Sequence, residues 1–334
     1  MTVDYHVHLE EGPYSFKWLD RTNRALQHFH QVAGEKHHRK WMLESHQLLS
    51  ERLENGPYSK PWLDLYLQKA KELDLKEVGI VDHLYRFMET KEYFIKYMDL
   101  SDSELGRKQE AWLKQVMTES MDEYWDFIQG EKEKWSRNGI ELRIGIEADY
   151  FPGCEKDLSL LLQTYEWDYV IGSVHFVDGW GFDNPETIQY FERFSLEGLY
   201  ERFFHIVEAA IRSGLFDFVA HLDNLKVFNF RPNEENLLPH YKRIASALAE
   251  TDTATEVNAG LYYRYPIEEM CPSPAFLKVL VDEGVKFTTS SDSHYPDDLG
   301  KYVEENSKML KALGIDEVAT FQKRRKQYKL LSSL

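Results

Sequence analysis

Histidine and carboxylate side chains recur at the ends of apolar segments along the 334-residue chain. The residues in these positions can all bind a metal ion: His6, His8, His83, Glu147, His175, His221, Glu256, Asp292 and His294. Imidazole nitrogen and carboxylate oxygen suit zinc, manganese or iron. The absence of thiolates from this set argues against a purely structural zinc site.

The spacing within the set is informative. Side chains two positions apart on a strand point to the same face, so His6 and His8 project together while Val7 turns away, and the same holds for Asp292 and His294. A lone histidine near a strand end is usually a hydrogen-bonded structural residue. Ionisable groups at seven strand ends are different, because removing water from all of them would be costly without a cation. The pattern therefore predicts a metal cluster.

A cluster of two or three divalent cations indicates a particular reaction. Such cations can bind a phosphoryl oxygen, generate hydroxide from a bridging water and offset charge in an in-line displacement. The sequence contains neither a G-x-x-x-x-G-K-[ST] loop nor a G-x-S-x-G elbow, which would indicate nucleotide-driven work or a serine nucleophile. The predicted chemistry is phosphoester hydrolysis.

The elements that must position these residues alternate along the chain. Short apolar or β-branched runs predict seven strands, at Thr2–His6, Glu77–Val81, Leu142–Ile146, Asp168–Val174, Phe216–Ala220, Ala254–Val257 and Val285–Thr289. Amphipathic patterns predict helices between them, at Lys60–Asp74, Glu104–Asn138, Glu186–Ser213, Glu234–Glu250, Pro274–Glu283 and Leu299–Leu313. This alternation favours parallel strands in an α/β barrel whose strand ends share one face, with an open doubly wound sheet as the alternative.

Composition narrows the class of substrate. The formal charge of −17, from 57 acidic and 40 basic residues, repels nucleic acids and anionic membranes, so we expect a small-molecule substrate. The two cysteines, Cys154 and Cys271, are far apart and predict neither a disulfide framework nor a zinc finger. No leader pattern and no run of 18 apolar residues occurs, which predicts a cytoplasmic protein.

One segment is duplicated. L-E-E-G-P-Y-S-F-K-W-L-D at 9–20 and L-E-N-G-P-Y-S-K-P-W-L-D at 53–64 are identical at nine of twelve positions. A single pair of copies indicates an internal duplication that lengthened the loop after the first strand. The inserted unit carries five histidines, at His28, His30, His37, His38 and His46. It is either a solvated helical excursion or a lid over the site.

The segments that carry the ligands together resemble the PHP (polymerase and histidinol phosphatase) superfamily, most closely its monofunctional histidinol-phosphatase branch. These segments are D-Y-H-V-H at 4–8, V-D-H at 81–83, G-I-E-A-D-Y at 145–150, G-S-V-H-F at 172–176, A-H-L-D-N-L-K at 220–226, E-V-N-A-G at 256–260 and S-S-D-S-H at 290–294. The resemblance implies a distorted seven-stranded (β/α) barrel. We expect a single domain over residues 1–334, with a helical insertion at about 12–56.

The resemblance also implies roles at the site. A first metal would be held by His6, His8, Glu147 and Asp292. Glu147 would bridge to a second metal, held also by His175 and His221, while His83 and His294 would face a third. Glu147, Asp292 and His294 are the candidate catalytic residues. Many members carry a histidine six residues after the H-x-H pair, where this chain has Tyr14, so the third site is empty, weakly held or completed from the insertion.

Other residues near the strand ends are candidates for supporting roles. Lys226 and Arg264 each lie just beyond a ligand-bearing strand end and are candidates for substrate or phosphate contact. Asp223 or Glu256 could orient a ligand histidine through its second nitrogen. The implied reaction is hydrolysis of L-histidinol phosphate to L-histidinol and phosphate. The alternatives are a PHP-type phosphoesterase for a nucleotide, a sugar phosphate or phosphotyrosine, and a metal-binding PHP module without turnover.

Overall fold

Seven parallel strands form the central sheet of the protein, whose computed structural model describes residues 2–10, 12–30 and 34–331. In spatial order these are β1 (Val3–His8), β2 (Glu77–Val81), β3 (Glu141–Asp149), β4 (Tyr169–Ser173), β7 (Phe218–Val219), β8 (Ala254–Asn258) and β9 (Phe287–Ser290). All seven predicted strands are present, with slightly shifted bounds. Apart from Glu141 their residues are buried, which explains why the strands read as apolar runs.

The two outer strands of the sheet, β1 and β9, approach each other and nearly close it into a barrel. The His8 amide donates to the Ser293 carbonyl at 2.7 Å, and Val7 forms a parallel bridge with Ser293. Because all strands are parallel, their carboxyl ends open onto one face. The structure therefore confirms the distorted seven-stranded α/β barrel and not the open sheet.

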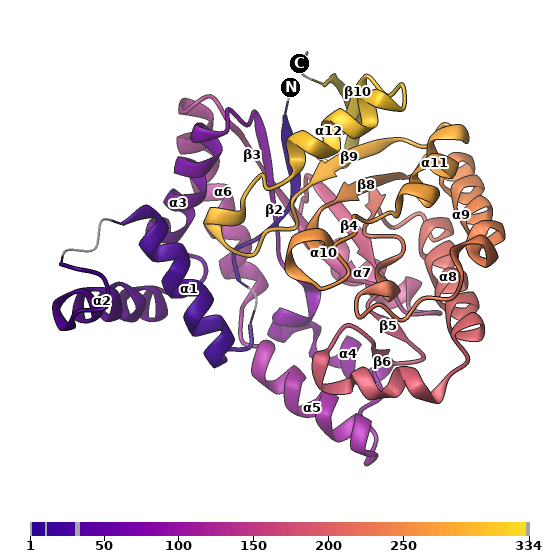
Figure 1. The fold of residues 1–334 in the computed structure, drawn as a ribbon, viewed down its shortest axis with the longest axis horizontal. Coiled ribbons are helices and arrows are strands. Elements are labelled where there is room, and N and C mark those ends of the chain that lie inside the picture. The colour runs from indigo at the N-terminus through magenta and orange to yellow at the C-terminus, as the bar shows by residue number, and fades with distance from the viewer. Residues whose placement is uncertain (1, 11, 31–33, 332–334) are drawn as a thin grey trace.

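Helices surround the barrel (Figure 1). Those that connect or follow the strands are α3 (Lys60–Glu72), α6 (Met121–Arg137), α7 (Glu155–Leu162), α8 (Leu196–Arg212), α9 (Leu238–Thr251), α11 (Pro274–Asp282) and α12 (Val303–Ala312). In α8 the Ser195 hydroxyl accepts from the Gly198 amide and caps the helix, while Leu199, Phe203 and Val207 form a buried stripe at four-residue spacing. Within the described residues we find no helix with the length and apolar character needed to cross a membrane.

Shorter elements lie in the connections. They are α4 (Lys91–Tyr97), α5 (Glu104–Val116), α10 (Gly260–Arg264), the hairpin of β5 (Phe176–Val177) and β6 (Trp180–Gly181), and the 3-10 helices η1 (Leu84–Arg86), η2 (Met88–Thr90), η3 (Pro185–Arg193), η4 (Asn224–Lys226), η5 (Glu234–Leu237) and η6 (Pro296–Asp298). Figure 1 shows α4, α5 and β6 together at the end of the molecule opposite the marked chain ends.

The prediction of one continuous helix over Glu104–Asn138 is wrong, because the chain forms α5 and α6 with a break at 117–120. At the break, Phe87 and Glu119 form an isolated parallel bridge. The Ser120 hydroxyl then accepts from the Glu123 amide and starts α6. The Ser-x-x-Glu signature of a helix start was present in the sequence. A similar serine cap separates η3 from α8 within the predicted Glu186–Ser213 helix.

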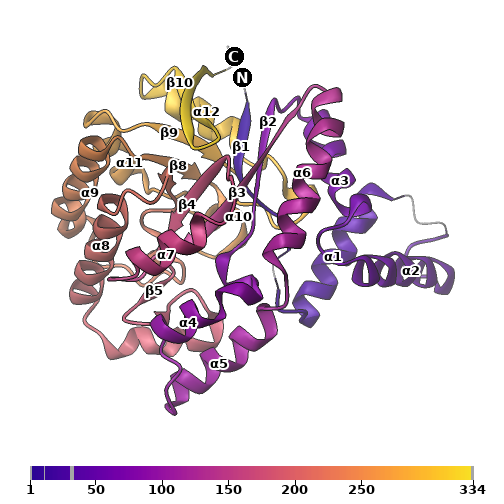
Figure 2. The same ribbon diagram turned by 180° about the vertical axis from the view of Figure 1, so that it is seen from behind.

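The predicted insertion, at about 12–56, contains two helices, α1 (Phe16–Phe29) and α2 (Arg39–Asn55). In Figure 1 they lie to one side of the barrel with α2 outermost, and Figure 2 shows the same arrangement from behind. Helix α1 is tied to the loop after β9, since the Arg21 guanidinium donates to Asp297 at 2.9 Å and to Asp298 at 2.7 Å. The insertion therefore braces a loop that follows His294.

An antiparallel hairpin of β10 (Glu317–Gln322) and β11 (Arg325–Leu330) was not predicted. It covers the end of the barrel where the strands begin, beside the marked chain ends (Figure 1). The Phe321 amide donates to the Tyr5 hydroxyl at 3.0 Å, and the Phe321 ring lies 5.6 Å from that of Phe218 and 6.2 Å from that of Tyr169. These aromatic rings close the barrel floor.

Candidate metal centre

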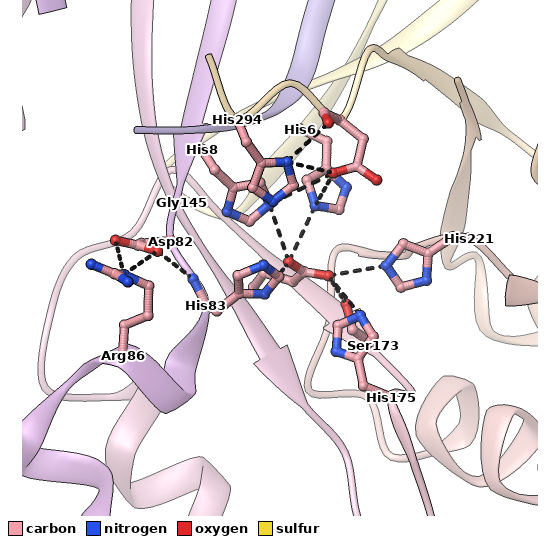
Figure 3. A network of polar contacts seen from close by, with 12 residues as sticks. His6, His8, Asp82, His83, Arg86, Gly145, Ser173, His175, His221 and His294 are labelled. Atoms are coloured by element: carbon pink, nitrogen blue, oxygen red, sulfur yellow. Dashed lines mark hydrogen bonds and ion pairs between the residues drawn. The ribbon is translucent and has the colours of Figure 1, made fainter. Parts of the chain in front are cut away.

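The eight residues predicted to bind metal converge at the carboxyl ends of the strands. His6 and His8 lie in β1 and Glu147 in β3, while the others follow β2, β4, β7 and β9. Their ligand atoms form four overlapping groups of three, each within 4.8 Å: His8, His83 and His294; His6, Glu147 and His221; His6, His8 and Asp292; His83, Glu147 and His175. Figure 3 shows the labelled histidines pointing toward one another from different strand ends.

Glu147 lies between two sets of histidines. Its Oε2 is 3.2 Å from His6 Nε2, 3.3 Å from His8 Nε2 and 2.8 Å from His83 Nδ1. Its Oε1 is 3.0 Å from His221 Nε2 and 3.5 Å from His175 Nε2. The two oxygens of one buried carboxylate thus face different ligand sets, as a carboxylate that bridges two cations would.

Several atoms of this cluster fit a metal better than they fit one another. Buried atoms without a hydrogen-bond partner among the described residues include His6 Nε2, both ring nitrogens of His8, His83 Nδ1 and Glu147 Oε2. Buried polar atoms are normally hydrogen-bonded, so a group of unpaired lone pairs in one place is typical of a metal-binding site. The residues present therefore fit divalent metal ions held by nitrogen and oxygen. Cys154 and Cys271 are buried free thiols outside these groups.

Carboxylates behind the cluster orient its histidines. His6 Nδ1 lies 3.1 Å from Glu256 Oε2, as expected for one of the two candidate orienting residues. His175 Nδ1 lies 2.7 Å from Asp149 Oδ1, a partner that was not predicted from the sequence. Such contacts fix the ring and leave the other nitrogen free to bind a metal. Asp149 follows Glu147 by two residues, so the spacing rule applied to His6 and His8 could have found it.

The charges around the cluster favour a cation. Burial lowers the pKa of His6, but Glu256 and Glu147 outweigh burial and hold that pKa well above its ordinary value. Burial likewise lowers the pKa of His175, yet the hydrogen bond to Asp149 raises it overall to about 10. Carboxylates that stabilise positive charge on these rings would equally stabilise a divalent ion between neutral imidazoles.

The two basic residues predicted to contact the substrate, Lys226 and Arg264, lie in different surroundings. Arg264, in α10, donates through Nη2 to Asp292 Oδ2 at 2.7 Å, and its Nη1 lies 2.7 Å from His294 Nδ1. Lys226 is fully buried and donates to Asp223 at 2.8 Å, Glu269 at 2.6 Å and the Met270 carbonyl at 2.7 Å. The expectation that Lys226 contacts substrate is therefore corrected, because its ammonium is already occupied in the interior.

Asp223, the other candidate for orienting a histidine, takes no part in the cluster. Its Oδ2 accepts from Lys226 and from the Ser273 amide at 2.9 Å. Asp223 lies near a ligand-bearing strand end as predicted, but its carboxylate pairs with Lys226 and the Ser273 amide and not with a histidine ring.

The inserted histidines do not complete a third metal site. His28, His30, His37, His38 and His46 are all exposed and belong to none of the groups found among the described residues. The Tyr14 ring packs against Trp18 at 4.8 Å, edge to face. The remaining candidates for a third metal are His8, His83 and His294, whose rings lie 4.2 to 5.9 Å apart.

A pocket of about 410 Å³ opens over the cluster. Six of the eight candidate ligands line it, as does Arg264, whereas Lys226 does not. The start of the insertion also contributes, through Gly12, Pro13, Ser15, Lys17 and Trp18. The lining also includes Tyr85, Trp112, Asp183 and Glu186. The pocket therefore joins the metal cluster to aromatic and charged side chains.

Known proteins are similar to this chain in sequence and in fold. Residues 59–260 match the family model of the PHP domain. Over 210 residues, 63% of this chain and 78% of the relative, the sequence is 35% identical to a Deinococcus radiodurans protein named "probable histidinol-phosphatase". The fold is similar, with a TM-score of 0.65 and 16% identity over 98% of both chains, to histidinol phosphate phosphatase from Lactococcus lactis, crystallised with zinc, L-histidinol and phosphate. The sequence match extends over more than half of the chain, and the chain belongs to the PHP domain family.

Proposed function

We propose that the protein is a metal-dependent phosphatase that hydrolyses L-histidinol phosphate to L-histidinol and phosphate. The observation that carries this proposal is the division of the two Glu147 oxygens between two sets of histidines. The 35% identical relative is named a histidinol-phosphatase, and the Lactococcus structure holds zinc, L-histidinol and phosphate. These names support the choice of substrate.

The eight convergent residues would hold two or three divalent ions, of zinc, manganese or iron. His6, His8, Glu147 and Asp292 would hold one ion, and Glu147, His175 and His221 a second. His83 and His294 would face a third position. Bound there, the ions would activate water and withdraw charge from the phosphoryl oxygens.

The protein's own residues would orient the ester. Arg264 lines the pocket and donates to Asp292, and its guanidinium would contact a phosphate oxygen there. The pairing with Asp292 keeps the guanidinium beside the candidate metal ligands, where the negatively charged phosphate of the ester would bind. Glu256 and Asp149 would hold the His6 and His175 rings in the orientation that presents the other nitrogen to an ion.

The test is to strip the purified protein of metal, reconstitute it separately with zinc, manganese and iron, and measure kcat/KM on a panel of phosphomonoesters. The panel should contain histidinol phosphate, a nucleoside monophosphate, a sugar phosphate, phosphotyrosine and 4-nitrophenyl phosphate. We expect histidinol phosphate to be the best substrate. Better turnover of another ester would favour a different PHP phosphoesterase, and metal binding without turnover would indicate a non-catalytic module.

A further inference from the structure

The lining of the pocket beside the metal cluster contains a carboxylate that the metal chemistry does not use. Of the carboxylates that line the pocket, Glu147 and Asp292 belong to the cluster, which leaves Asp183 and Glu186. Asp183 is partly buried, whereas Glu186 is exposed. Apart from its own backbone amide, Asp183 has no hydrogen bond or ion pair to its carboxylate among the described residues. A partly buried charge without a partner is costly unless a ligand pairs with it.

The chain around Asp183 is held firmly. The Phe182 amide donates to the His175 carbonyl at 3.2 Å, and the Phe182 side chain is fully buried. On the other side, the Asn184 side chain accepts from the Glu186 amide at 2.9 Å and caps η3. Because both neighbours are fixed, the Asp183 carboxylate is presented at a defined place beside a metal ligand.

Asp183 is also close to the reaction centre. Its charge acts on His175 and His83 and on the hydroxyl of Tyr85. The Tyr85 ring stacks on His83 at 4.6 Å and contacts the Trp112 ring at 4.8 Å. Aromatic rings thus extend from His83 through Tyr85 to Trp112, and the charge of Asp183 acts on the first two of these side chains.

This arrangement matches the chemistry of a 2-amino alcohol phosphate that carries an aromatic ring. In L-histidinol phosphate the ammonium is on the carbon next to the one bearing the ester oxygen, and the imidazole is further out. With the phosphate at the metals and Arg264, the ammonium would lie near Asp183 and the imidazole near Tyr85 and Trp112, which line the same pocket. We propose, on the basis of the proposed function, that Asp183 binds the ammonium group of the substrate and selects amino-bearing phosphate monoesters.

The test compares Asp183→Asn with the wild-type holoenzyme on esters that differ only in the amino group. One pair is histidinol phosphate and 3-(imidazol-4-yl)propyl phosphate, and a second is 2-aminoethyl phosphate and ethyl phosphate. We expect Asp183→Asn to lower kcat/KM for the amino-bearing ester of each pair by about ten- to hundredfold, mainly through KM. Turnover of the amino-free ester should change less than about threefold, because its phosphate contacts are intact. Glu186→Gln, on the same wall but exposed, should leave both ratios unchanged.

Equal losses on both members of a pair would overturn the proposal, because they would show a general structural role. If Asp183→Asn fails to fold, the affinities of Asp183→Ser for L-histidinol and for its amino-free analogue are measured by calorimetry. Equal losses of affinity for the two compounds would again overturn the proposal. The proposed function fails separately, if the wild type prefers another ester to histidinol phosphate. The second pair of esters still tests recognition of the ammonium in that case.

Discussion

The Nδ1 nitrogen of His6 lies 3.1 Å from Oε2 of Glu256, on the opposite side of the ring from the Nε2 nitrogen that faces Glu147. Glu256 is fully buried, and its Oε1 also accepts from the His221 amide at 3.1 Å and from Asn258 Nδ2 at 2.8 Å. One carboxylate therefore orients one ligand and anchors the backbone of another.

Replacing Glu256 by Gln keeps the volume but removes the charge that faces His6. We expect the affinity for metal to fall by about 10- to 100-fold, because the ring loses its orienting partner and part of its basicity. Competition with a metal-binding dye measures the affinity. Asp149→Asn, which removes the matching contact to His175, should act in the same direction. Unchanged affinity in both variants would contradict an orienting role.

Glu147→Gln should reduce activity more than His83→Asn. The two oxygens of Glu147 contact both sets of histidines, whereas His83 approaches only Oε2. We expect kcat/KM to fall at least roughly tenfold further in Glu147→Gln, equivalent to about 1.4 kcal/mol in the barrier. Metal content per chain, measured by mass spectrometry of the elements, should fall as well. Equal losses of activity and metal in the two variants would count against bridging.

Arg264→Gln should impair binding of the phosphate ester without unfolding the protein. Arg264 lines the pocket and is only partly buried, so its removal takes away a donor for phosphate and leaves the core packed. We expect kcat/KM to fall by about 10- to 100-fold. Inorganic phosphate should also inhibit the variant less strongly. If phosphate inhibits Arg264→Gln as strongly as the wild type, Arg264 does not bind the phosphate.

Lys226→Met should have the opposite profile. Removing the buried ammonium leaves Asp223 and Glu269 without their shared cation, and breaking such a buried pair costs about 3–5 kcal/mol. We expect the midpoint of urea unfolding to fall while KM of the folded protein is nearly unchanged. A rise in KM without loss of stability would restore Lys226 as a substrate contact.

Deleting residues 13–56 merges the two copies of the duplicated segment and removes both inserted helices. The chain can close because Trp62 donates to the Leu9 carbonyl at 2.8 Å, so the second copy already contacts the end of β1. Glu10 loses the indole of Trp18 and the guanidinium of Arg52, and should be changed to Gln in the same protein.

We expect this shortened protein to fold and keep its metals, because the eight candidate ligands lie outside the deleted stretch. KM and substrate preference should change, since Lys17 and Trp18 leave the pocket wall. Circular dichroism, metal content and the ester panel measure these outcomes. Unchanged kinetics on every ester would show that the insertion only decorates the surface.

The barrel and the convergence of its ligands were predictable for a physical reason. Fully buried parallel strands read as apolar runs, and a barrel brings their ends together whatever their separation in sequence. The direction of a side chain in a loop cannot be predicted in the same way, because a loop has no regular alternation of buried and exposed residues. Lys226 was assigned to the substrate because it follows His221, yet its partner Glu269 is 43 residues away and turns it inward. Asp183 follows a short hairpin whose two-residue strands leave little periodic signal.

The aromatic floor of the barrel bears on how the chain folds during synthesis. Tyr5, Tyr169 and Phe218 come from three strands, and Phe321, in the hairpin that follows all seven, covers them. Until the ribosome has added β10, the ring of Phe321 cannot pack on these three rings. The contact between β1 and β9, which are far apart in sequence, also forms late in synthesis. A nascent chain therefore carries an unsealed apolar surface until translation has passed the hairpin, which is the stage at which chaperones would bind it most strongly.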